Sequence, residues 1–205
     1  MTAASILVIL GHPARHSLCG ALAERYAEGA RQRGASVQTL ALGELAFDPV
    51  LRAGYRTPQA LEDALSQAQQ AILHARHLAF VYPVWWGAMP ALLKGFVDRV
   101  FLPGFAFRYR DGSARWDRLL AGRAADLLVT MDAPPWYYRW FDRMPGHWQM
   151  KRTILQFSGI DPVRVASYGP VRTAAAAHIE RWLDDAARRG ARAAMRLPAP
   201  AAAGA

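Results

Sequence analysis

Two patterns of apolar residues alternate along the chain. One is a short continuous apolar run, such as SILVIL at residues 5–10, which is typical of a strand buried on both faces of a sheet. In the other, apolar residues recur every three or four positions, as at Leu18, Leu22 and Tyr26, which is typical of an amphipathic helix. The patterns predict strands over residues 5–10, 36–42, 77–82, 125–130 and 163–168. They predict helices over residues 18–30, 58–76, 90–102, 149–160 and 173–189.

The alternation of strands and helices predicts a single α/β domain, because successive parallel strands need a crossover helix between them. We therefore expect a flavodoxin-like, doubly wound, five-stranded parallel sheet in the order 2-1-3-4-5, with helices on both faces. The domain is expected to take up residues 1–197. Residues 198–205, PAPAAAGA, have no periodic pattern and are expected to form a disordered C-terminal tail.

One segment interrupts this alternation. In FAFRYRDGSARW, the aromatic residues Phe105, Phe107 and Tyr109 take every second position, and the pair Asp111–Gly112 is typical of a hairpin turn. The segment is therefore predicted to form a hairpin with an aromatic face. It could cover a ligand or another surface, or it could seal the edge of the sheet, and the sequence leaves both interpretations open.

Composition places the chain among globular proteins. It has 205 residues, of which 53% are hydrophobic and 20% charged, so it can bury a substantial core. No apolar run approaches the roughly 20 residues needed to span a bilayer, and the N-terminus lacks a basic region before its apolar run. The single cysteine, Cys19, excludes an intrachain disulfide. We expect a cytoplasmic protein with no membrane span.

The chain is strongly basic, with a net charge of +9, and arginine supplies nearly all of the positive charge. Nucleic acid is the first partner that such a charge suggests. The arginines are scattered, however, and no nucleic-acid-binding motif is visible. The sequence therefore favours a basic surface that attracts small anionic ligands, and we expect no nucleic-acid partner.

The unusual residues follow the first, third and fourth predicted strands, in the segments GHPARHSLC, PVWWGAMP and MDAPPWYYRW. In a doubly wound sheet, ligands bind beyond the carboxyl ends of the strands, at the point where the strand order reverses. These three loops meet at that point. The sequence therefore predicts a single ligand site built from all three.

The first loop has the chemistry of an anion site. Ser17 is placed to cap the following helix, whose free backbone N–H groups and dipole favour phosphate. His12, Arg15 and His16 add further donors beside the tight turn at Gly11. The loop lacks the glycine patterns of dinucleotide and ATP sites. A zinc pair of the two histidines would need a third ligand, which is not in motif spacing, so we expect no metal.

The second and third loops supply flat aromatic surfaces. Adjacent side chains in extended backbone point in different directions, so a core explains at most one of Trp85 and Trp86. Gly87 permits close approach, and Trp136 and Tyr138 follow in the third loop. Any one of these aromatic residues could serve packing alone. Together, on three converging loops, they indicate a site for a planar multi-ring ligand.

These residues resemble a known family. The segments GHPARHSLCGALAERYAEGARQRGASVQTLAL, FDPVL, YPVWWGAMPALLKGFVDRVFLPGFAFRY and VTMDAPPWYY are similar to those of the flavodoxin-fold NAD(P)H:quinone oxidoreductases, the relatives of DT-diaphorase and of modulator-of-drug-activity-type reductases. The resemblance covers about residues 5–185. It implies a homodimer that binds FMN or FAD without a covalent bond, takes a hydride from NAD(P)H, and passes two electrons to a quinone or similar acceptor in a ping-pong sequence.

The resemblance also assigns roles to residues by motif position. The residues implied to hold the flavin phosphate chain are His12, Arg15, His16, Ser17, Leu18 and Cys19. Those implied to border the flavin ring are Pro83, Val84, Trp85, Trp86, Gly87, Thr130, Met131, Asp132, Ala133 and Tyr138. Those implied to line the acceptor pocket are Phe107, Tyr109 and Trp136. Of all these, Tyr138, Tyr109 and Trp86 are the implied catalytic residues.

The chain departs from the family pattern in three places. The loop after the fourth strand is commonly Thr-Thr-Gly-Gly in the family, whereas residues 130–133 are TMDA. Tyr138 can take the position of a tyrosine near the flavin, but His147 is displaced from that of its histidine partner. No match is clear for an arginine that holds adenine, which slightly favours FMN. The alternative function is that of a flavin-binding ancillary subunit of a membrane transporter.

Overall fold

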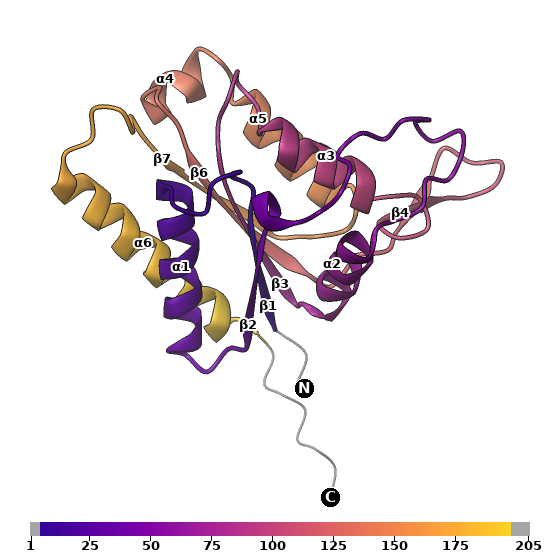
Figure 1. Cartoon of the computed structure of the whole chain (residues 1–205), viewed down its shortest axis with the longest axis horizontal. Coiled ribbons are helices and arrows are strands. Elements are labelled where there is room, and N and C mark those ends of the chain that lie inside the picture. Colours follow the sequence, from indigo (N-terminus) through magenta and orange to yellow (C-terminus); the bar gives the residue numbers. More distant parts are fainter. Residues whose placement is uncertain (1–4, 198–205) are drawn as a thin grey trace, which may run out of the picture.

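The computed structural model describes residues 5–197, so the predicted tail at 198–205 lies outside the described residues. The centre of the molecule is a parallel sheet in the order β2-β1-β3-β6-β7 (Figure 1). Its strands are β1 Ile6–Leu10, β2 Val37–Ala41, β3 His77–Pro83, β6 Ala124–Thr130 and β7 Val163–Tyr168. Since β6 and β7 are the fourth and fifth strands of this sheet, the predicted order 2-1-3-4-5 is confirmed.

The sheet has a buried centre because its inner strands are apolar throughout. Every residue of β1 and β3 is buried, and β6 is buried after its first residue. A strand that packs against helices on both faces needs such a continuous apolar run. The edge strand β2 has no neighbour on its outer side, and polar Gln38 and Thr39 are exposed there.

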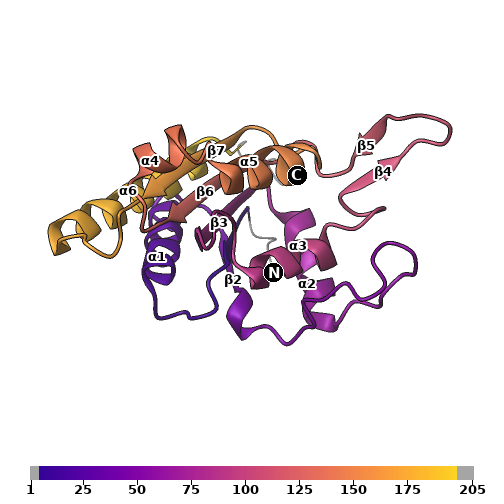
Figure 2. The same ribbon diagram turned by 90° about the horizontal axis from the view of Figure 1, so that it is seen from above.

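Helices cover both faces of the sheet and form a three-layer structure (Figures 1 and 2). One face packs against α1 Leu18–Arg31 and α6 Ala176–Met195. The other packs against α2 Asp63–His74, α3 Ala91–Val100 and the segment formed by α5 Pro145–Trp148 and η2 Gln149–Gln156. The remaining helices are the short η1 Leu42–Glu44 and α4 Pro135–Trp140.

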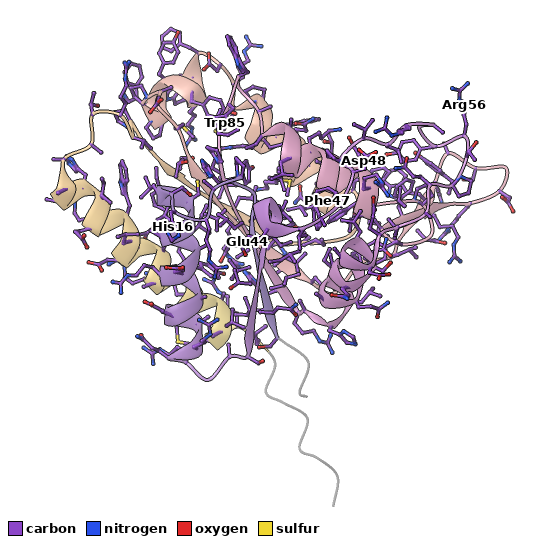
Figure 3. All side chains as sticks on the ribbon, viewed as in Figure 1. His16, Glu44, Phe47, Asp48, Arg56 and Trp85 are labelled. Carbon is purple, nitrogen blue, oxygen red and sulfur yellow. The ribbon has the colours of Figure 1, made fainter. Side chains whose placement is uncertain are left out.

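Several helix boundaries differ from the predicted ones. The helix predicted over residues 58–76 begins only at Asp63, because Arg99 holds the preceding loop in another conformation. The fully buried guanidinium of Arg99 donates to the carbonyl oxygen of Ala60 and to the carboxylate of Glu62, both at 2.8 Å. Figure 3 shows Arg56 at the outer tip of this loop, far from Trp85.

The helices near the C-terminus also differ from expectation. The segment predicted as a helix over residues 149–160 is a π-helix that ends at Gln156, and α5 leads into it. The last helix was expected over residues 173–189, but α6 begins and ends later. It begins later because a hydrogen-bonded turn joins Ala174 to Val171. It ends later because small residues continue its buried face to Ala193. The short helix α4 was not predicted at all.

The predicted hairpin is present. Strand β4 Phe107–Tyr109 pairs in antiparallel fashion with β5 Trp116–Arg118, and the turn between them includes Gly112 at φ +66°. The hairpin is a separate two-stranded sheet that projects away from the main one (Figure 2). Its base is anchored where Trp116 stacks on Phe157, with ring centroids 4.5 Å apart. It does not pair with an edge strand of the main sheet.

Candidate functional site

The three unusual loops meet at the carboxyl ends of β1, β3 and β6. They enclose a cleft of about 250 Å³. The residues that line it are His12, Ser17, Leu18, Cys19, Pro83, Val84, Trp85, Thr130, Met131, Asp132 and Val171. All except Val171 were among the predicted site residues. The convergence expected from strand order is therefore present in the structure.

The first loop presents hydrogen-bond donors to the cleft. The Ser17 hydroxyl accepts from the backbone N–H of Gly20 at 3.1 Å and donates to the carbonyl of Ala14 at 2.8 Å, so it caps α1. Nδ1 of His12 lies 2.9 Å from both the backbone N–H and the carbonyl oxygen of Ala14, so this residue holds the imidazole beside the cleft. The free N–H groups of the first turn of α1 suit an anion.

Two predicted members of this loop lie outside the cleft. Arg15 donates to Glu44 at 3.0 Å and lies 4.0 Å from Glu24, so carboxylates already neutralise its charge. His16 is exposed and does not line the cleft. In this conformation neither Arg15 nor His16 faces the cleft, where the resemblance implies that the flavin phosphate chain lies.

Cys19 and Thr130 join two of the loops at the cleft. The Cys19 Sγ and the Thr130 Oγ1 lie 3.3 Å apart in a buried hydrogen bond. Burial raises the pKa of the Cys19 thiol to about 11, and the hydrogen bond to Thr130 offsets only part of that effect. The thiol is therefore protonated and unreactive at neutral pH.

The second loop makes a tight turn. The backbone groups of Trp85 and Ala88 bond to each other at 2.9 and 3.1 Å, and the two central residues have positive φ, 51° at Trp86 and 76° at Gly87. Such a turn suits glycine or asparagine, so a tryptophan at its first central position is strained. Trp86 is also fully exposed, whereas Trp85 lines the cleft and lies edge-on to His12 at 5.7 Å. Strain of this kind is typical of functional sites.

Tyr138 is buried behind the second loop and does not line the cleft. Its hydroxyl donates to the carbonyl of Gly87 at 2.9 Å and accepts from the backbone N–H of Gly146 at 2.9 Å. Burial raises the pKa of this hydroxyl, so it is neutral at physiological pH. The geometry makes Tyr138 a clamp between the third loop and the turn that holds Trp86.

His147 lies next to Tyr138 in space, with ring centroids 5.1 Å apart. Its Nε2 bonds to the Ser167 Oγ at 2.8 Å, and burial lowers the pKa of the imidazole to about 4, so the ring is neutral at pH 7. Like Tyr138, it does not line the cleft. Eight residues lie between it and Tyr138 in the sequence, and the turn between α4 and α5 brings the two rings together.

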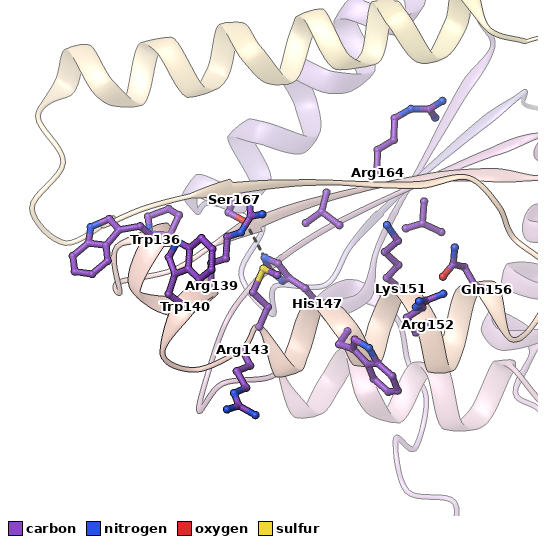
Figure 4. Close-up of a pocket in the computed structure, with 15 residues that line it drawn as sticks. Trp136, Arg139, Trp140, Arg143, His147, Lys151, Arg152, Gln156, Arg164 and Ser167 are labelled. Carbon is purple, nitrogen blue, oxygen red and sulfur yellow. Dashed lines mark hydrogen bonds between the residues drawn. The ribbon is translucent and has the colours of Figure 1, made fainter.

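The residues predicted for the acceptor pocket lie away from the cleft within one chain. Phe107 and Tyr109 line a separate hollow of about 540 Å³ between the hairpin and α3. Trp136 lines a third cavity, beside β7 (Figure 4). Ala133 and Gly87 neighbour the cleft without lining it. Within the described chain, neither Phe107 nor Tyr109 reaches the cleft.

Sequence reasoning missed Val171. It follows β7, and β7 pairs in parallel with β6, so its loop ends at the same edge of the sheet. The parallel pairing of β7 with β6 is the feature from which the position of Val171 could have been predicted.

Among residues 5–197, no three histidine, cysteine or acidic side chains come together as a metal site would require. In the same range, no helix is both long and apolar enough to cross a bilayer.

A family model described as Flavodoxin-like fold matches residues 4–189. The chain belongs to this family. It is 28% identical over 176 residues to an uncharacterized NAD(P)H oxidoreductase of Haemophilus influenzae, which covers 80% of this chain and 83% of the relative. It is also 28% identical over 151 residues to the ribosyldihydronicotinamide dehydrogenase [quinone] of Pongo abelii, with 63% and 64% covered.

The fold is also similar to that of solved structures. The crystal structure of Smu.1420 from Streptococcus mutans superposes with a TM-score of 0.78 at 25% identity, which covers 91% of this chain and 98% of that one. The two structures therefore share most of the flavodoxin-like domain described above.

Proposed function

We propose that the chain is a flavin-dependent NAD(P)H oxidoreductase that reduces quinones or related electrophilic acceptors. The observation that carries the proposal is the cleft itself, which combines an anion site with an aromatic wall at the point where strand order reverses. The names of the relatives from Haemophilus influenzae and Pongo abelii agree with this chemistry. The donor set in the cleft fits a flavin, and we favour FMN slightly over FAD.

The phosphate end of the ligand would lie on the first loop. The capping bond of Ser17 fixes the first turn of α1, which leaves the N–H groups of Leu18 and Cys19 free to donate. The imidazole of His12 lines the cleft beside them. The dipole of this 14-residue helix favours the same negative charge.

The ring end would lie between the second and third loops. Trp85 supplies a flat wall, and the loop of Thr130, Met131 and Asp132 supplies polar backbone at the opposite edge. The bond from the N–H of Val84 to the carbonyl of Thr130, at 2.7 Å, holds these two loops together. A bound flavin supplies the redox chemistry, by accepting a hydride from NAD(P)H and delivering two electrons to the acceptor.

The side chains of the cleft position and desolvate the ligand, and they need not transfer protons. The only carboxylate among them belongs to Asp132, whose Oδ1 accepts from the backbone N–H of Arg172 at 3.1 Å. Cys19 is protonated at neutral pH because it is buried. The cleft therefore contains no pair of carboxylates for acid–base chemistry, which agrees with hydride chemistry carried by a cofactor.

A homodimer completes the proposed site. Phe107 and Tyr109 form an edge-to-face pair with centroids 5.4 Å apart, on a hairpin that projects from the domain (Figure 2). Tyr109 and Trp86 are among the most exposed large side chains of the described chain. We propose that a second copy brings this hairpin over the cleft, where it lines the acceptor pocket.

The test is steady-state kinetics of the flavin-supplemented protein with NADH or NADPH and a benzoquinone. We expect parallel double-reciprocal lines, which are typical of a ping-pong sequence. Ser17→Ala should raise the flavin concentration needed for half-maximal activity, whereas Ser66→Ala, an exposed site on α2, should not. Absence of nicotinamide oxidation with both FMN and FAD would contradict the proposal.

A further inference from the structure

The cavity that Trp136 lines lies between α4, the α5–η2 segment and the edge strand β7 (Figure 4). Its volume is about 1080 Å³, and it shares no lining residue with the cleft. A cavity of this size can hold an organic ligand. The proposed redox function leaves it without a role.

The cavity is basic and has no acidic lining residue. Figure 4 shows Arg139 and Lys151 on either side of the hydrogen-bonded pair His147–Ser167, while Arg143 and Arg164 point away from that pair. Within residues 5–197, neither Arg139 nor Lys151 pairs with a carboxylate. Unneutralised cations that face one cavity attract an anion.

A buried polar atom in the wall also lacks a partner. His147 is only 5% exposed, its Nε2 is taken by Ser167, and its Nδ1 makes no hydrogen bond in the structure. Buried imidazole nitrogens are normally paired, because an unmade hydrogen bond inside a protein is costly. The described chain therefore leaves one nitrogen of this lining residue unsatisfied.

The same cavity has flat aromatic walls that are open to solvent. Trp136, Trp140 and Trp148 all line it, and each is more than half exposed. The guanidinium of Arg139 lies 5.5 Å from the centre of the Trp140 ring, so the cation and the aromatic face are already together. A planar ring could lie against these indoles while its charged group meets the cations.

We propose that this cavity binds a flat aromatic anion, with its ring against the tryptophans and its phosphate, sulfonate or carboxylate group near Arg139 and Lys151. The site is separate from the flavin cleft and does not depend on the proposed redox function. The His147–Tyr138 contact links its wall to the turn at Gly87.

Isothermal titration of the flavin-loaded protein tests the proposal, with AMP, naphthalene-2-sulfonate and 2-naphthoate as aromatic anions. Adenosine and inorganic phosphate separate the contribution of the ring from that of the charge. We expect at least one of the three anions to bind with one site per chain, and both of the separate groups to bind at least about tenfold more weakly. Which anion binds most tightly identifies the charged group.

The double variant Arg139→Gln/Lys151→Gln should weaken binding of that anion by about tenfold or more. Its matched control, Arg33→Gln/Arg56→Gln, removes the same charge from exposed sites elsewhere and should change the affinity less than about twofold. Equal losses in both variants would overturn the site, because the effect would then come from net charge alone.

Three further results would also overturn the proposal. In the first, adenosine binds as tightly as AMP and neither of the other two anions binds better. In the second, the anion releases the bound flavin. In the third, no anion binds because a second copy of the chain covers the tryptophans, which sedimentation would reveal. The same titration on flavin-free protein separates the two proposals. If the chain binds no flavin but still binds the anion, only the proposed redox function fails.

Discussion

The hydroxyl of Tyr138 donates to the carbonyl oxygen of Gly87 at 2.9 Å, and so α4 holds the turn that carries Trp86. The same hydroxyl accepts from the backbone N–H of Gly146, which connects the turn to the start of α5 as well. One side chain thus joins three segments around the rim of the cleft. The third loop contributes to the site by fixing the second loop as well as by lining it.

Removal of this hydroxyl should loosen the rim. Tyr138→Phe leaves the carbonyl of Gly87 without the bond from the phenol and weakens the pairing of the buried N–H of Gly146. We expect the free energy of unfolding to fall by about 1–3 kcal/mol. Urea denaturation measures it. The neighbouring Tyr137→Phe is the control, because Tyr137 is 42% exposed, and a similar loss there would show that the clamp contributes nothing specific.

The backbone strain at Trp86 should lower the free energy of unfolding by a measurable amount. Trp86→Gly relieves the positive φ of 51°, whereas Trp86→Ala keeps a Cβ atom and therefore keeps the strain. We expect the glycine variant to be more stable than the alanine variant by about 1 kcal/mol in the flavin-free protein. Both variants should bind flavin or use the acceptor less well than the native chain. Equal stability of the two variants would mean that the turn carries no strain.

Cys19 should resist thiol reagents in the folded protein. Its pKa, raised to about 11 mainly by burial, leaves little thiolate at pH 8, and the side chain is only 2% exposed. Reaction with Ellman's reagent should be slow in buffer and complete in denaturant. Fast labelling of the native, flavin-free protein would show that the base of the cleft is more open than described.

A buried polar cluster at the opposite end of the sheet should make stability depend on pH. The hydroxyl of Tyr26 donates to Asp126 at 2.8 Å, and Nε2 of His77 lies 3.3 Å from the same carboxylate oxygen. Burial by itself would raise the pKa of Asp126, but His77, Tyr26 and the charge of Arg164 lower it below its ordinary value. A lowered pKa adds stability above the unfolded-state pKa of about 4, and that stability is lost as the pH falls through the folded-state value.

Asp126→Asn should therefore lose about 1–3 kcal/mol of unfolding free energy at pH 7 and less at pH 3. Chemical denaturation at the two pH values measures the difference. Asp142→Asn, at an exposed position, is the control and should show little change at either pH. A loss in Asp126→Asn that is equal at pH 7 and pH 3 would exclude the assigned charge state.

The sheet could be predicted from the sequence because its signal is local. After His77, the run HLAFVYP at β3 is apolar on both faces of the strand, and its short length between turn residues is typical of a buried strand. The meeting of three loops then follows from strand order, which the alternation of elements restricts strongly. The hairpin was predictable for a similar reason, because its aromatic alternation and its Asp-Gly turn are both local signals.

The remaining features depend on contacts between distant segments. The loop that precedes α2 is held by Arg99 from α3, so no pattern within the loop shows that the helix starts late. Helix α4 consists mostly of aromatic residues and is fixed by the bond from Tyr138 to Gly87, and its own sequence has weak helical preference. Trp86 and Tyr109 are both exposed because of how the turn and the hairpin project from the domain, which no pattern within either segment shows.

The central claim is that the cleft at the carboxyl ends of β1, β3 and β6 holds a flavin. A fluorescence titration of flavin-free protein with FMN and with FAD tests it most directly. We predict saturable binding of one flavin per chain, weakened at least about tenfold by Trp85→Ala and unchanged by Phe141→Ala, an exposed aromatic residue outside the cleft. Absence of saturable binding of either flavin, or equal weakening by both substitutions, would contradict the claim.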